Sequence, residues 1–292
     1  MNCSATGCSK RPFPCEGRPR LLEAHSPLHR AHRGIHCGGT REFLLVAPDP
    51  SVIYAKAFFD LQLQFAQRVA ILSELPLARA LLDYTNLYIR FGLGRGFDPA
   101  HPTWREYLAG LQGANDTRDW TYRFYLRRPD AMAAPAIVAT FGCFSYSRLS
   151  GDRIRLHFQN ADTDGHSSLG IDRRGQRLAD LAALFGHVTQ TLGQSVQVVG
   201  ASWLYNLEAY RRLFPIPYLA TAHVIHRFQN MPLWGQFLDR YGEVKENMTR
   251  PFLERLECQS SLDGVGQCFP FQVLSVQASV HEFYDFYGIK SP

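Results

Sequence analysis

The residues best suited to form a binding site lie in one tract of the chain, residues 199–237. Ser202, Trp203 and Asn206 fall close together near its start, and Gln229 follows later. Together these side chains offer a flat aromatic surface with hydroxyl and amide groups at its edge, a combination typical of small-molecule pockets. We therefore predict that these four residues bind a substrate.

One histidine has the placement expected of a general base. His157 lies in an alternating stretch, so it shares one strand face with Arg155, while Leu156 and Phe158 point to the other face. An imidazole titrates near neutral pH and can accept a proton from a reacting group. We predict His157 as the catalytic residue; the alternative is an exposed strand histidine without a chemical role.

A polar stripe is predicted on an otherwise apolar, tyrosine-rich helix. Asp83, Asn86 and Arg90 are spaced i, i+3 and i+7, which places them on one helix face. Arg95 follows in a glycine-punctuated loop. In the functional interpretation, the three residues form a substrate-binding rim on which Arg90 or Arg95 clamps an anion. In the alternative, the stripe is the solvent face of an amphipathic helix.

A second interpretation of the same tract is a protein-binding surface. Met231, Trp234 and Phe237 are of the types that dominate binding hot spots, so we predict them as contacts to a protein partner. The alternative is ordinary core packing, with Trp203 and Trp234 both buried.

Two familiar site motifs are incomplete. Ser202 lacks the glycine that a nucleophile elbow places two residues after the serine, which disfavours a serine hydrolase. Residues 160–165 imitate the start of a calcium loop, but Ile171 stands where the loop requires a bidentate carboxylate. No metal site is predicted in the body of the chain.

The elements that position these residues divide into a helical half and a mixed half. Apolar residues recurring three and four apart predict helices over 49–72, 76–91, 102–111 and 116–126. After residue 129, period-two segments alternate with helical ones; the predicted strands are 137–146, 154–158, 196–199, 220–228 and 271–276.

Helices are predicted between these strands, over about 174–192, 207–214, 233–240 and 251–256, and a short one ends the chain. The fold class is α+β: a helical domain over 43–130, then a mixed α/β domain over 131–292 whose mixed sheet is covered by helices.

Composition narrows the function classes. The 292 residues are 46% hydrophobic and 13% aromatic, which suits a sizeable core. Seven Lys and Arg against three Glu give residues 1–42 a charge of +4, which leaves about +1 of the total +5 for the rest. We therefore predict no nucleic-acid partner. No apolar run is long enough to cross a membrane, so we expect no membrane association and a cytoplasmic location.

The first 42 residues differ in composition from the rest. They contain four of the seven cysteines and four of the eleven histidines. The cysteines are not paired at two to four residues, the spacing typical of structural zinc sites. We expect a disordered, arginine-rich leader, which an initiation codon assigned too far upstream would explain; the alternative is a metal site.

The order of elements in the second half resembles a known family. A strand ending Ile-Arg-Leu-His, a helix, a strand running into Ser-Trp-Leu-Tyr, and then Ile-His-Arg-Phe-Gln occur over residues 137–240. This resembles the C-terminal domain of bacterial GNAT-like acyltransferases. The resemblance implies coenzyme A held near a helix N-terminus, where Arg173, Arg174 and Arg177 replace the family's glycine-rich loop as the predicted phosphate ligands.

Two functions follow for testing. The first is an acyltransferase-like enzyme that moves an acyl group from a coenzyme A thioester to a small amine, with His157 as base. The second is a non-catalytic module that binds a ligand or a protein.

Overall fold

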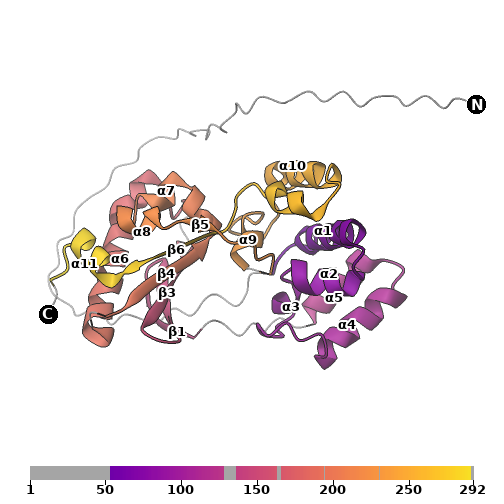
Figure 1. The fold of residues 1–292 in the computed structure, drawn as a ribbon, viewed down its shortest axis with the longest axis horizontal. Coiled ribbons are helices and arrows are strands. Elements are labelled where there is room, and N and C mark those ends of the chain that lie inside the picture. The colour runs from indigo at the N-terminus through magenta and orange to yellow at the C-terminus, as the bar shows by residue number, and fades with distance from the viewer. Residues whose placement is uncertain (1–52, 128–135, 163–165, 194, 230, 291–292) are drawn as a thin grey trace, which may run out of the picture. The chain divides into compact units, whose positions relative to one another are not determined.

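The computed structural model describes residues 53–127, 136–162, 166–193, 195–229 and 231–290 (Figure 1). The predicted leader over 1–42, with its cysteines and histidines, lies outside these residues. Within them the chain is α+β, with a helical first part followed by a six-stranded mixed sheet, which confirms the predicted fold class.

The first part of the chain forms helices α1 to α5, with bounds α1 Lys56–Ser73, α2 Leu77–Tyr84, α3 Leu87–Arg90, α4 Pro102–Gly113 and α5 Thr117–Leu126. Asp116 caps α5 by accepting from the backbone N–H groups of Arg118 and Asp119, at 2.9 and 3.0 Å. The helices predicted over 102–111 and 116–126 are therefore confirmed.

The helix predicted over 76–91 is wrong at its centre, because the chain breaks into α2 and α3. Thr85 has an extended backbone, its hydroxyl donates to Leu81 O at 2.6 Å, and it accepts from Leu87 N at 3.3 Å. A threonine side chain that bonds the neighbouring backbone in this way replaces helical hydrogen bonds.

The sheet has the strand order β1-β2-β3-β4-β6-β5. The strand bounds are β1 Ile137–Phe141, β2 Phe144–Leu149, β3 Arg153–Phe158, β4 Gln197–Ser202, β5 His223–Val224 and β6 Leu274–Ser279. The pair β3 and β4 is parallel and the other neighbouring pairs are antiparallel. The single strand predicted over 137–146 is two strands, because the chain reverses at Gly142, whose φ is 55°.

Helices between and after the strands cover one face of the sheet (Figure 1). Ile154, Val198 and Val276 on that face pack in one core with α6, α7, α8 and α11. These helices have the bounds α6 Arg174–Leu192, α7 Glu208–Arg211, α8 Ile216–Ala220 and α11 Val280–Tyr287. The helix predicted over 174–192 is confirmed.

A second core joins the early helices to a late segment of the chain. Phe65 and Leu81 share it with Trp234 on α9 (Met231–Gly235), Phe252 on α10 (Glu246–Glu257) and Phe269. The predicted boundary near residue 130 therefore separates segments that pack together.

The described residues also contain three 3-10 helices, over Ile171–Arg173, Trp203–Asn206 and Leu262–Cys268.

Candidate functional site

The two parallel strands separate at their carboxyl ends. Strand pairing joins β3 and β4 at three positions, the last of which sets Arg155 opposite Val199. Beyond that point β3 continues through residues 156–158 beside β2, while β4 continues through residues 200–202 beside β6. In the described part of the chain no pairing joins these two stretches, so a wedge opens between them.

The wedge leaves backbone polar groups unused by the sheet. Successive residues of a strand direct their N–H and C=O groups to opposite edges. Each three-residue stretch therefore turns the backbone groups of at least one residue into the wedge, where they can bond a ligand.

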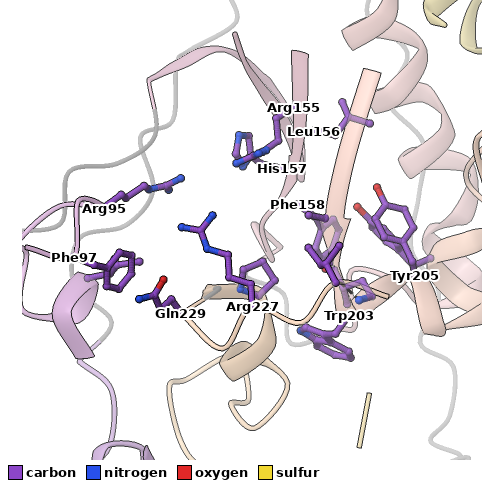
Figure 2. A pocket seen from close by; sticks show the side chains of 17 residues that line it. Arg95, Phe97, Arg155, Leu156, His157, Phe158, Trp203, Tyr205, Arg227 and Gln229 are labelled. Atoms are coloured by element: carbon purple, nitrogen blue, oxygen red, sulfur yellow. Dashed lines mark hydrogen bonds between the residues drawn. The ribbon is translucent and has the colours of Figure 1, made fainter. Parts of the chain in front are cut away.

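A cavity of about 550 Å³ lies at this wedge (Figure 2). Its size is in the range of about 300–1,000 Å³ that small-molecule sites occupy. Four consecutive β3 residues line it, 155–158, and residues 201–205 line it from the β4 side. Because side chains alternate between the faces of a strand, a cavity lined by four in a row reaches both faces of the sheet. We call it the wedge cavity.

One side of the wedge cavity is strongly basic. Arg95, Arg155 and Arg227 line it, and no Asp or Glu is among its lining residues. In Figure 2 Arg95 and Arg227 extend toward the side of β3 that carries Arg155 and His157. Among the described residues, none of the three guanidiniums has a hydrogen-bonding or ion-pair partner, and the Arg155 Nε is fully buried. This is the chemistry of an anion site.

The same cluster acts on the predicted base. Burial, with the nearby charges of Arg155 and Arg95, lowers the pKa of His157 to about 4. Its Nε2 lies 2.8 Å from the hydroxyl of the buried Ser147. The imidazole is therefore neutral at neutral pH, and the other ring nitrogen is left for a ligand.

The other side of the wedge cavity is aromatic. Phe158, Tyr205 and Tyr210 line it, and burial raises the pKa of both tyrosines well above the usual value, so their phenols stay protonated. The Tyr205 hydroxyl lies 2.8 Å from that of Tyr218. The two hydroxyls occupy the space that a Cβ at Gly200 would take, so glycine is required there.

The structure brings four of the predicted site residues together. His157, Ser202, Trp203 and Gln229 all line the wedge cavity. Trp203 stacks on a phenylalanine ring with 5.6 Å between centroids, and the Gln229 amide donates to a backbone carbonyl of α2 at 3.0 Å. Asn206 does not line the cavity. Its amide donates to two backbone carbonyls, at 2.7 and 2.8 Å, so it holds the 3-10 helix that begins at Trp203.

The predicted polar stripe does not form. Asp83 lies on α2 and pairs with Arg79 of the same helix at 2.5 Å. Asn86 is completely buried between helices, and Arg90 is buried on α3 with its guanidinium 4.1 Å from the centre of the Tyr54 ring. None of the three lines the wedge cavity, and the break at residue 85 removes the single-helix spacing on which the predicted stripe rested.

The predicted phosphate ligands are also separated. Arg177 is 3% exposed, pairs with Asp180 at 3.2 Å and Asp162 at 3.3 Å, and contacts the Cys143 sulfur. A guanidinium enclosed in this way is not available to a ligand, which corrects its assignment. Arg173 and Arg174, at the start of α6, do not line the wedge cavity.

The predicted hot-spot patch is part of the core. Trp234 and Phe237 are completely buried, and the Trp234 indole N–H donates to a backbone carbonyl at 2.8 Å. They cannot reach a partner unless the core opens, so their interpretation as an exposed patch is corrected. The side chain of Met231 lies outside the described residues.

Sequence reasoning missed Arg227 and the tyrosines as site residues, and it treated Arg155 only as a neighbour of His157. The alternation of β3 places Arg155 beside His157, and the sequence also predicts Arg90 or Arg95 as an anion clamp. Arg227 lay in the strand predicted over 220–228, but the structure contains only β5 there. Only the folded structure therefore shows that the three arginines line one cavity.

The described residues contain no cluster of three or more side chains suited to hold a metal ion. Within the same residues, no helix has both the length and the apolar character needed to span a bilayer. Comparisons with protein families, with curated protein sequences and with solved structures gave no match.

Proposed function

We propose that the wedge cavity is the active site of an acyltransferase-like enzyme that moves an acyl group from a coenzyme A thioester to a small amine. The observation that carries the proposal is the separation of two parallel strands beside His157. The unpaired strand edges suit a narrow ligand that contains amide groups, as the arm of coenzyme A does.

The chemistry requires alignment and one proton acceptor. The amine nitrogen attacks the thioester carbonyl carbon, the N–C bond forms and the C–S bond breaks, so the products are an amide and a thiol. The amine proton passes to His157, the departing thiolate takes a proton from water, and His157 returns its proton to the solvent, so the protons balance. The neutral imidazole of His157, held by Ser147, is a sufficient base for this step, because the amine proton becomes more acidic as the N–C bond forms. Backbone N–H groups of the wedge would stabilise the oxygen anion.

The diphosphate of coenzyme A would lie outside the wedge cavity. Arg173 and Arg174 remain the proposed ligands, since they stand at the first turn of the 19-residue helix α6. The aromatic side, with Phe158 and Tyr210, would hold the acyl chain.

A first experiment measures thermal stability with coenzyme A, acetyl-coenzyme A and longer thioesters. Binding at about 100 times Kd contributes about 2.7 kcal/mol, which raises the melting temperature by about 5–10 °C in a protein of this size. Ala201→Phe places a ring in the wedge and should abolish the shift. Ala57→Phe, at an exposed position of α1, is the control. No shift with any thioester would refute the proposal.

The second candidate is a non-catalytic module that binds an anionic small molecule. The low pKa of His157 favours it, because a group with a pKa of about 4 is a weak base at neutral pH. Thiol release from thioesters in the presence of amines separates the two. An enzyme should lose about 10²-fold or more in rate with His157→Ala but not with the exposed His281→Ala. Ligand binding without thiol release would favour the module.

A further inference from the structure

The arginines of the wedge cavity are close to the reacting centre. Arg155 and His157 are two residues apart on one face of β3, so their side chains leave the strand about 7 Å from each other. Arg95 lines the same cavity as His157, and its charge contributes to the low pKa of that imidazole. The phosphates of a bound thioester are separated from its carbonyl carbon by the whole arm of coenzyme A. An anionic group bound by these three arginines would therefore belong to the second substrate.

The cluster has a charge imbalance that a ligand would correct. Three guanidiniums meet at the cavity with no carboxylate among the lining residues. Burial, together with repulsion from Arg95 and Arg227, lowers the pKa of Arg155. A bound anion would remove this repulsion and accept charge-assisted hydrogen bonds, since each guanidinium offers five N–H donors.

We infer that the amine acceptor carries a carboxylate or phosphate group, which Arg95, Arg155 and Arg227 bind, a few bonds from the nitrogen that is acylated. This inference rests on the proposed acyl transfer. An amine without such an anion would approach as an ammonium ion and be repelled by the cluster. With its anion held by the arginines, the same field favours the neutral amine, which is the nucleophile.

The acceptor class is tested with matched pairs of amines that differ in the anion. Glycine is compared with glycinamide, and ethanolamine phosphate with ethanolamine. Thermal shift without any thioester measures binding, and thiol release from acetyl-coenzyme A measures turnover. We expect the anionic member of at least one pair to raise the melting temperature and to have a KM at least tenfold below that of its neutral partner. Equal behaviour within both pairs would overturn the inference.

Substitution of the cavity arginines tests whether they bind the anionic group of the amine. Arg95→Gln and Arg227→Gln change exposed side chains that have no partner among the described residues, so folding is expected to survive. Each should raise the KM for the anionic amine about tenfold or more and leave the KM for the thioester unchanged. Arg250→Gln, exposed on α10, is the control. An unchanged KM for the amine in both cavity variants would also overturn the inference.

The outcomes separate this inference from the proposed function. Turnover of neutral and anionic amines at equal KM would leave acyl transfer standing and remove the anionic acceptor. Binding of anionic amines that is lost in Arg227→Gln, without turnover of any thioester, would support the arginine site and remove acyl transfer.

Discussion

The environment assigned to His157 makes the stability of the fold depend on pH in a defined window. In the unfolded chain an imidazole titrates near 6.5, whereas in the folded chain burial and two arginines lower the pKa of His157 to about 4. Between these values the unfolded state binds a proton that the folded state does not. Stability from this residue is therefore complete above pH 6.5 and falls as the pH drops toward 4.

The lowered pKa of His157 sets how much free energy of unfolding is lost at acidic pH. One pKa unit corresponds to about 1.4 kcal/mol, so the full difference is about 3 kcal/mol, of which about 2 kcal/mol is lost between pH 7 and pH 5. In His157→Gln this contribution is absent. The free energy of unfolding of the native chain should therefore fall by about 2 kcal/mol more than that of the variant over the same interval. In melting temperature the extra fall is about 4–8 °C.

Urea unfolding of both proteins at pH 7 and pH 5 measures this difference. The buffers must contain neither phosphate nor sulfate, because an anion bound between the arginines would raise the pKa of His157 and reduce the effect. His281→Gln removes an exposed imidazole of α11 and should behave as the native chain. The reasoning is refuted if the native chain and His157→Gln lose the same stability between the two pH values.

Three further predictions concern the packing around the site. Gly200→Ala should lower the free energy of unfolding in urea by about 1–3 kcal/mol, because the added Cβ meets two tyrosine hydroxyls. Gly186→Ala in α6 is the control: its Cβ has free space, so it should raise the free energy of unfolding by about 0.5–1 kcal/mol. Trp234→Ala should cost about 3–5 kcal/mol in the same assay; a loss below about 1 kcal/mol would contradict its place in the core. Arg177→Met leaves the buried Asp180 without its cationic partner and should cost about 3–5 kcal/mol. An unchanged midpoint would contradict the buried pairing.

Local patterns carried enough information to predict the fold class and several elements. Helix α6 was predicted over its full length, because the helical pattern of a segment is contained in its own residues. The helix over 116–126 was predicted with its correct start, because the cap at Asp116 depends only on neighbours in sequence. The break at Thr85 was not predicted. Its cause is a hydrogen bond from the Thr85 hydroxyl to the backbone of the preceding turn, and the sequence does not distinguish such a threonine from one inside a helix.

The site was predictable only in part, for a reason of geometry. His157 and Trp203 could be named because their residue types suit a pocket, and both line the wedge cavity. The three arginines of the cavity lie far apart in sequence: Arg95 in the loop between α3 and α4, Arg155 in β3 and Arg227 in the segment after β5. Only the folded chain brings them together. Arg177 is chemically like them, and its burial against two carboxylates has no signature in sequence.

The most direct test of the central claim is a crystal structure of the chain with bound coenzyme A. We expect the sulfur end of the ligand to enter between residues 156–158 and 200–202, with amide groups bonded to the strand edges near His157. Coenzyme A ordered elsewhere on the protein, with the space between β3 and β4 left unused, would contradict it.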